Sequence, residues 1–297
     1  MKALGYEALV RSLELAGLQK GDVCHVQSDL RRIGPVDCDM SASSVGDFYL
    51  SALLEVLGEE GTLTTCTAFE DYGRYGVPFI REESPSRLGL LSEHIRTRAD
   101  AVRSMHPIVS VTGLGRRAEE ICGGSHFDGF GYASPWGRLH RSNAKILTLG
   151  MGSTGGGTTF FHFVEKLYGV PYQYTKIYDA PVFSNGEEVP GPFTLSVRYL
   201  DFSIVNTPVR VKTALVERDL AREVATGRAR TWCAAAEPIV SQMMQMFDEN
   251  RWVMLEEPPR FRAGEIPRDG TTGPMVVVSD KARDDLADRN VSSAPPE

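Results

Sequence analysis

In the segment from Lys145 to Gly169, the sequence predicts an apolar strand, then a glycine-rich turn, then a helix. This helix contains His162 and Glu165, which lie three residues apart. Because residues three apart share one face of a helix, the carboxylate of Glu165 can hold the imidazole ring of His162. A histidine titrates near neutral pH, and a carboxylate fixes its tautomer and stabilises the imidazolium. The pair therefore predicts general-base catalysis. The alternative is a structural histidine, since the neighbours of His162 on this helix are mostly apolar.

A polar turn follows the first predicted strand. Gln27 and Asp29 stand at the end of that strand, and Arg31 and Arg32 come directly after them. Open α/β folds bind ligands beyond the carboxyl ends of their strands, so we expect this turn to contact a ligand, with the guanidinium groups near phosphates. A solvated helix start is an equally good interpretation of the two arginines.

Two further segments present backbone groups to a ligand. The extended stretch through Ser110 and Val111 follows a proline, and its N–H and C=O groups suit pairing with an amide-bearing molecule. Ser134 and Pro135 form a favourable cap and first position of a helix, whose N-terminus attracts an anion.

The elements that must position these residues alternate between helix and strand, which is typical of an α/β fold. Helices are predicted over 4–17, 43–57, 85–98, 116–121 and 158–167, and strands over 21–27, 61–69, 106–112 and 145–149. Beyond Pro171 the sequence predicts strands over 174–178, 181–183 and 193–199, a hairpin turn at Ser184-Asn185-Gly186, and a last helix over 231–247. We expect one domain over 1–257 and a largely disordered tail over 258–297.

Composition limits the classes of function. The 297 residues are 42% hydrophobic and 24% charged, with a formal net charge of -7. An acidic chain without clustered basic residues is a poor match for nucleic acid or an anionic membrane. Five widely spaced cysteines without a CxxC pair predict reduced, buried thiols, and no stretch resembles a signal peptide or a membrane span. These features favour a cytoplasmic protein.

Taken together, the motifs have a specific order: SDLRRIG, RSMHPxxSV, FGxxSPWxRL, an apolar strand ending in Gly150, and TxxHFVE. In this order and spacing the chain resembles the aminoglycoside 3-N-acetyltransferase family from about Gly21 to Gly169. The resemblance implies a three-layer α/β/α sandwich with a mixed central sheet. It also implies transfer of an acetyl group from acetyl-coenzyme A to an amine of an aminoglycoside, an amino sugar or a related small biosynthetic amine.

The resemblance also assigns roles. It makes His162 the general base and Glu165 the acid that orients it. It places coenzyme A against Arg31, Arg32, Ile33, Gly34, Ser110, Val111, Ser134 and Pro135. Backbone N–H groups of Ser110-Val111 or of the 152–157 loop would stabilise the thioester oxyanion, the thiolate leaves without a strong acid, and no metal is needed.

One position departs from the family. Many relatives have a histidine where this chain has Gln27, and His25 lies two residues earlier on the same strand face. His25 either takes over part of the role or is structural. The change predicts an altered acceptor pocket.

The acceptor amine is expected to meet the segment 70–84. The predicted substrate contacts are Glu70, Asp71, Tyr72 and Tyr75 from this segment, together with Gln27 and Asp29. Tyrosines suit stacking on sugar rings, and Phe79 and Tyr172, Tyr174 and Tyr178 could add to them. The segment carries both acids and arginines, which favours an amino sugar or another small amine over a polycationic aminoglycoside.

Other interpretations remain open from the sequence. A metal-dependent hydrolase could use His25, Asp29, His106, His162 and Glu165, although these residues form no close ligand motif. The glycine-rich turn lacks the lysine of a phosphate-binding loop, so a nucleotide-binding module is a weaker interpretation. A non-catalytic interaction protein is the third, and a homodimer is a possible assembly.

Overall fold

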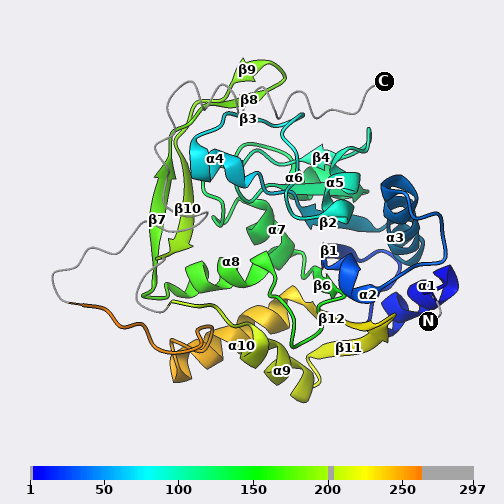
Figure 1. Ribbon diagram of the computed structural model, residues 1–297. Helices are drawn as coiled ribbons and strands as arrows, with labels where there is room; N and C mark the ends of the chain where they lie inside the picture. The colour runs from blue at the N-terminus through cyan, green and yellow to red at the C-terminus, as the bar shows by residue number, and fades with distance from the viewer. Residues whose placement is uncertain (1–2, 200–203, 263–297) are drawn as a thin grey trace.

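The computed structural model describes residues 3–199 and 204–262 (Figure 1). Its helices are α1 (Tyr6–Leu15), α2 (Leu30–Ile33), α3 (Ala42–Leu57), α4 (Glu70–Tyr75), α5 (Leu90–Arg96), α6 (Ala118–Cys122), α7 (Pro135–Arg141), α8 (Thr159–Tyr168), α9 (Val209–Glu217) and α10 (Ala236–Glu249). Its strands are β1 (Val23–Ser28), β2 (Thr62–Cys66), β3 (Phe79–Ile80), β4 (Val102–Arg103), β5 (Val111–Gly115), β6 (Lys145–Leu149), β7 (Gln173–Tyr178), β8 (Val182–Ser184), β9 (Glu187–Glu188), β10 (Phe193–Arg198), β11 (Ala221–Thr226) and β12 (Ala229–Ala235).

The main sheet is mixed and has the strand order β11-β12-β6-β1-β2-β5-β4. The central strand β1 pairs in parallel with both β2 and β6. On either side of these three, the pairs β12 with β6 and β2 with β5 are antiparallel. Parallel strands end at one edge, so the residues that follow β1, β2 and β6 are brought together there.

Alternate residues of each strand face opposite layers, because side chains along a strand have a period of two. In β6, Ile146 belongs to one buried cluster and Leu147 to the other. The first cluster packs against α6, α7, α8, α9 and α10, and the second against α1, α3 and α5. Figure 1 shows α1 and α3 on one side of the sheet and α7 and α8 on the other. This arrangement confirms the expected α/β sandwich with a mixed central sheet.

Two small sheets lie beside the main one. Strands β7 and β10 form an antiparallel pair, and β3, β8 and β9 form a three-stranded sheet. The predicted turn at Ser184-Asn185-Gly186 joins β8 to β9, with Asn185 and Gly186 both at positive φ. That hairpin is confirmed. The β7–β10 pair follows α8 in the chain, so it lies close to the predicted site (Figure 1).

Three predicted elements differ from the structure. The strand predicted over 106–112 is a buried turn that enters β5 only at Val111, because Val111 donates its backbone N–H to the hydroxyl of Ser104 and so closes the turn. The helix predicted over 85–98 begins at Leu90, since the side chain of Glu93 accepts the N–H of Ser86 and holds the preceding residues in a loop.

The largest difference between the predicted and the observed secondary structure lies near the C-terminal end of the described residues. Residues 231–235 were predicted as helix but belong to β12, which pairs with β6 and β11. An alanine-rich sequence favours helix by itself, and pairing on two sides overrides that preference. The helix α10 begins directly after the strand.

The structure also bears on the predictions for membrane spans, cysteines and the C-terminal tail. No helix within residues 3–199 and 204–262 is long and apolar enough to cross a membrane. All five cysteines are free thiols, four of them buried and Cys38 partly exposed. The predicted tail falls mostly on residues 263–297, which lie outside the described residues.

Candidate active site

The helix α8 presents His162 to solvent and hides Glu165. Its N-cap residue Thr158 accepts the backbone N–H of Phe160, and its aromatic residues enter the core. The His162 side chain is 41% exposed, whereas that of Glu165 is 0% exposed. His162 Nδ1 lies 2.5 Å from Glu165 Oε2, in the geometry predicted from their spacing. His162 is therefore not sealed in the core.

Three donors satisfy the buried carboxylate of Glu165. Besides His162, the hydroxyl of Tyr172 donates to Oε1 at 2.6 Å and Nε2 of Gln173 donates to Oε2 at 3.0 Å. Burial and the neighbouring carboxylate raise the pKa of Tyr172, so its hydroxyl keeps its proton as a donor. A buried carboxylate is costly unless it is hydrogen-bonded, and this set of contacts fixes its position. Neither the tyrosine nor the glutamine was assigned this role from the sequence.

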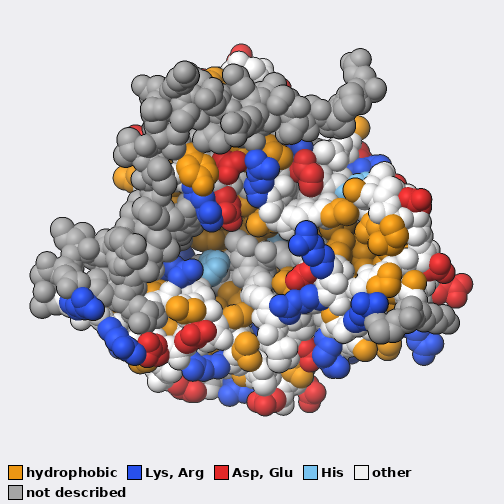
Figure 2. All heavy atoms as spheres, in the orientation of Figure 1, with side chains coloured by type: hydrophobic (Ala, Val, Ile, Leu, Met, Phe, Trp, Pro, Cys, Tyr) orange, Lys and Arg blue, Asp and Glu red, His pale blue; other side chains and the backbone are white. Residues whose placement is uncertain are grey.

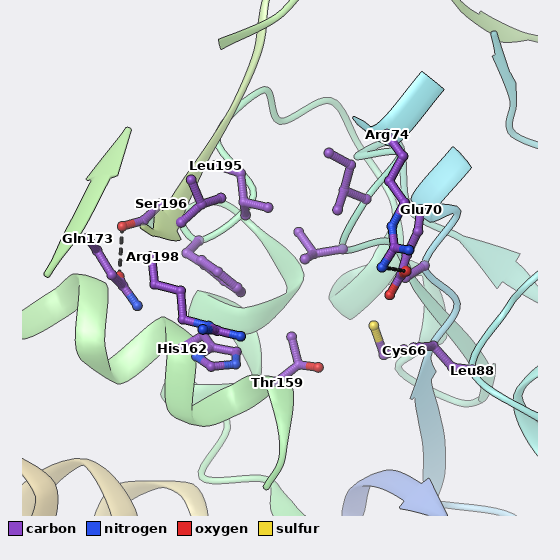
Figure 3. A pocket seen from close by; sticks show the side chains of 15 residues that line it. Cys66, Glu70, Arg74, Leu88, Thr159, His162, Gln173, Leu195, Ser196 and Arg198 are labelled. Atoms are coloured by element: carbon purple, nitrogen blue, oxygen red, sulfur yellow. Dashed lines mark hydrogen bonds and ion pairs between the residues drawn. The ribbon is translucent and has the colours of Figure 1, made fainter. Parts of the chain in front are cut away.

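His162 lines a cavity of about 480 Å³, which we call the His162 cleft. It is lined by Cys66, Ala68, Glu70, Arg74, Leu88, Ile108, Val109, Phe130, Thr159, His162, Gln173, Leu195, Ser196, Val197 and Arg198. Figure 3 shows that β10 and α4 supply opposite walls, with the imidazole between them. Burial raises the pKa of the Cys66 thiol to about 12, so it is a neutral wall group.

Gln27 does not contact the cleft as a ligand-binding residue. Its Oε1 accepts the backbone N–H of Thr159 at 2.7 Å, and its Nε2 donates to the hydroxyl of the same residue at 3.1 Å. Thr159 lines the cleft one helical turn before His162. The predicted substrate contact at Gln27 is therefore corrected: its amide is used to hold the first turn of α8.

His25 does not replace the missing histidine. Its ring is fully buried, bonds Thr64 through Nδ1 at 3.0 Å and packs edge-on against Trp136. Burial lowers the pKa of His25 to about 3, so the ring is neutral. It is a structural residue of the sheet.

A second cavity of about 1040 Å³ lies beyond β1, and we call it the Arg31 groove. It is lined by Ser28, Asp29, Leu30, Arg31, Gly34, Pro35, Val36, Met40, Ala42, Val45, Tyr49, Arg87, Leu88, Gly89, Leu90 and Met151. Leu88 lines both cavities, so the two adjoin. Figure 2 shows a histidine in the hollowed part of this face and an apolar area with basic side chains to its right.

The polar turn after β1 contributes to this groove in part. Arg31, Gly34 and Asp29 line it, and Asp29 pairs with Arg32 at 3.1 Å. Asp29 was predicted to contact the substrate amine, but it lies on the groove and not on the cleft. Ile33 is buried in the core, and its carbonyl accepts the N–H of Arg228.

The backbone site predicted at Ser110 and Val111 is closed. Ser110 and Val111 are fully buried, the Ser110 carbonyl accepts the N–H of Thr67, and β5 has a neighbour on each side. The wall of the cleft is formed instead by the two residues before them, Ile108 and Val109. The prediction of an open strand edge there is wrong.

Ser134 caps α7 as predicted, accepting the N–H of Gly137 and donating to the carbonyl of Gly131 at 2.7 Å. Ser134 and Pro135 are buried, however, and line neither the His162 cleft nor the Arg31 groove. The open anion site predicted at this helix start is therefore corrected to a buried cap.

The predicted acceptor segment places one of its four residues in the cleft. Glu70 lines it and pairs with Arg74 at 2.9 Å. Asp71 pairs with Arg87 instead, and Tyr72 is buried with its hydroxyl donating to the carbonyl of Ala180. Tyr75 is partly buried against the core. The rings of Tyr72, Phe79, Tyr172 and Tyr178 are buried, so they do not form the predicted stacking surface.

Three hydrogen bonds hold the glycine-rich loop after β6. Lys212 Nζ donates to the hydroxyl of Thr148 and to the carbonyl of Gly156, and Ser153 donates its N–H to Glu223. That N–H is therefore not directed at a thioester. Gly150 opens the loop at φ +81, where a Cβ would lie 2.5 Å from the Asp29 carbonyl oxygen, so only glycine fits.

The residues of the hydrolase alternative are not gathered. His106 is buried, forms a hydrogen bond with the carbonyl of Thr194 and lines neither the His162 cleft nor the Arg31 groove. His25 is buried beside Trp136. Within the described ranges, no three histidine, cysteine or acidic side chains form a group suited to a metal ion.

Fold and site thus define an α/β protein with a carboxylate-held histidine on the wall of a cleft beyond the parallel strands. The sequence profile of the family described as aminoglycoside 3-N-acetyltransferase matches residues 26–248. The chain belongs to this family, and an N-acetyltransferase that uses acetyl-coenzyme A is the enzyme class predicted from its motifs.

Individual relatives agree. The aminoglycoside N(3)-acetyltransferase III of Serratia marcescens is 27% identical over 79% of this chain and 94% of its own length. The aminoglycoside N(3)-acetyltransferase VII of Streptomyces paromomycinus is 29% identical over 61% of this chain and 67% of its own.

Solved structures show the same fold. The crystal structure of aminoglycoside acetyltransferase AAC(3)-Xa superposes with a TM-score of 0.70 at 24% identity, over 85% of this chain and 94% of that one. The YokD protein from Bacillus subtilis gives 0.69 at 22% identity, over 84% and 95%.

Proposed function

We propose that this protein transfers the acetyl group of acetyl-coenzyme A to a primary amine bound in the His162 cleft. The observation that carries the proposal is the exposed imidazole of His162, held by a carboxylate that is itself fully buried and accepts three hydrogen bonds. Such an arrangement suits a group that must gain and lose a proton without moving.

His162 is the general base of this proposal, and Glu165 orients it. With Nδ1 engaged by Glu165, Nε2 accepts a proton from the amine as its nitrogen attacks the thioester carbonyl. The new C–N bond forms, the C–S bond breaks, and the electron pair leaves with the thiolate, to which the imidazolium can return the proton. The Glu165 charge stabilises the imidazolium during this step. Such a base contributes roughly 10²–10⁴-fold to the rate.

The Arg31 groove fits a coenzyme that is apolar in its arm and anionic at its phosphates. Met40, Leu88 and Leu90 give it exposed apolar walls, and Arg31 stands at its edge. Because Leu88 also lines the His162 cleft, a thioester arm lying in the groove ends beside the imidazole. Nothing in this step requires Ser110, Val111, Ser134 or Pro135, all of which are buried.

The test combines binding with turnover. Acetyl-coenzyme A is expected to raise the melting temperature, because a ligand that binds only the folded state stabilises it. Small amines are expected to release free thiol in its presence. Arg32, which was also predicted to contact coenzyme A, lines neither cavity and pairs with Asp29 at the surface. Arg31→Ala should therefore weaken coenzyme binding several-fold and lower its salt dependence, whereas Arg32→Ala serves as the matched control. Absence of both the thermal shift and thiol release would refute the proposal.

The proposal also includes a single catalytic domain over 1–257, a cytoplasmic location and a homodimeric assembly. The names of the relatives support an amino sugar as the acceptor.

A further inference from the structure

The His162 cleft contains few charged side chains, and their balance is unusual for a polycationic ligand. Apart from the imidazole, the charged residues on its wall are Glu70, Arg74 and Arg198. Glu70 and Arg74 form an ion pair at 2.9 Å and largely neutralise each other. Among the described residues that line the cleft, this leaves Arg198 without a carboxylate partner.

Arg198 ends β10 and reaches into the cleft from the wall opposite α4. The register of the β7–β10 pair places it across from Gln173, the residue that donates to Glu165. Its guanidinium donates to the carbonyl of Ile204. Within residues 3–199 and 204–262 no carboxylate forms an ion pair with it. In Figure 3 the guanidinium points toward the imidazole of His162.

The carboxylate of Glu165 cannot serve a cationic ligand. Glu165 is 0% exposed, lies behind the imidazole ring and is already shared among His162, Tyr172 and Gln173. Among the cleft-lining residues that the structure describes, a ligand with several ammonium groups would find one carboxylate, that of Glu70 paired with Arg74, and would also meet the Arg198 guanidinium. Positive charges on the ligand and on Arg198 repel each other within one cleft.

A guanidinium has five N–H donors in a planar fork that matches the oxygens of a carboxylate or phosphate. We infer that the natural acceptor is an amine carrying a carboxylate or phosphate group, which Arg198 binds while the amine lies at His162. This inference rests on the proposed acetyl transfer and narrows its acceptor to an anionic amine. Arg198 thereby contributes substrate binding and orientation.

The test uses two amines that differ only in the anion, D-glucosamine and D-glucosamine 6-phosphate, together with the polycation kanamycin. We expect the phosphorylated amine to have the highest kcat/KM of the three. Arg198→Ala should lower kcat/KM for the phosphorylated amine roughly 10- to 100-fold and leave D-glucosamine within about twofold. Arg198→Lys should recover part of the loss, since it keeps the charge without the fork.

Arg210→Ala is the matched control, because Arg210 also donates to main-chain carbonyls but lies outside the cleft. Equal losses in the Arg198 and Arg210 variants, or a wild-type preference for kanamycin or for D-glucosamine, would overturn the inference while leaving acetyl transfer intact.

Calorimetry gives a readout independent of turnover. With coenzyme A present, D-glucosamine 6-phosphate should bind the wild type more tightly than D-glucosamine, and Arg198→Ala should remove the difference. Phosphate-dependent binding that survives in Arg198→Ala would refute the role of this residue. Failure of acetyl transfer itself would instead be seen as no thiol release with any of the three amines.

Discussion

If Glu165 acts through the imidazole of His162, removing the glutamate's charge should have no effect once the histidine is gone. This prediction is a double-mutant cycle on kcat, using His162→Ala, Glu165→Gln and the double variant. The two side chains are joined by a 2.5 Å hydrogen bond, and the carboxylate is not exposed to the cleft. The geometry therefore gives Glu165 no route to the substrate other than the ring.

The magnitudes follow from the contacts. His162→Ala removes a general base and should lower kcat by roughly 10²–10⁴-fold. Glu165→Gln replaces a charged hydrogen bond to the imidazolium by a neutral one, a loss of about 1.5–3 kcal/mol or roughly 10- to 100-fold in kcat. Tyr172→Phe keeps the charge but removes the 2.6 Å donor to it, and should cost less than tenfold.

The assay measures thiol release at saturating acetyl-coenzyme A, with folding of each variant checked by its melting temperature. In the His162→Ala background, both Glu165→Gln and Tyr172→Phe should leave kcat unchanged within about twofold. If Glu165→Gln lowers kcat by the same factor whether or not the histidine is present, the two act independently, and the orienting role assigned to the glutamate is refuted.

Two further variants probe the elements that position the site. Gln27→Ala leaves the N–H of Thr159 without its 2.7 Å acceptor and should lower the free energy of unfolding by about 1–2 kcal/mol. Gln27→Glu keeps an acceptor oxygen there and should lose less stability. If urea denaturation gives the same loss of unfolding free energy for both variants, this role of Gln27 is contradicted. Burial lowers the pKa of Lys212 to about 7, so the unfolded chain binds this proton more tightly and the wild type gains stability as the pH rises from 7 toward 10. The stability of Lys212→Met relative to the wild type should therefore fall by about 2 kcal/mol between pH 7 and pH 9, and a constant difference would show that the amine does not titrate in this range.

The elements predicted well from sequence are those whose local signals agree with their surroundings. The helix α3 combines an apolar face with a Ser41 cap and ends at Gly58 at positive φ, and it was predicted within a residue. The strand β12 was missed because its alanines favour helix, and only its two neighbouring strands decide otherwise. The turn before Val111 was missed for a related reason: a hydroxyl seven residues back closes it.

The same distinction applies to the site. His162 and Glu165 are three residues apart on one helix, so their contact is local and could be predicted. Gln173, Ser196 and Arg198 reach the cleft through the pairing of β7 with β10, which the sequence does not specify. Ser196 and Arg198 lie two residues apart in β10 and so share one face of it, but which cavity that face meets depends on how the pair packs.

The departure at Gln27 shows why residue type at a motif position is an incomplete guide to role. A side chain ending in an amide offers both an acceptor and a donor, and here both are used on Thr159. The two nitrogens of an imidazole point in different directions. A histidine at position 27 could therefore not accept the N–H of Thr159 and donate to the hydroxyl of Thr159 at the same time. Gln27 therefore anchors the start of α8, and in the proposed reaction His162 is left as the one imidazole that lines the cleft.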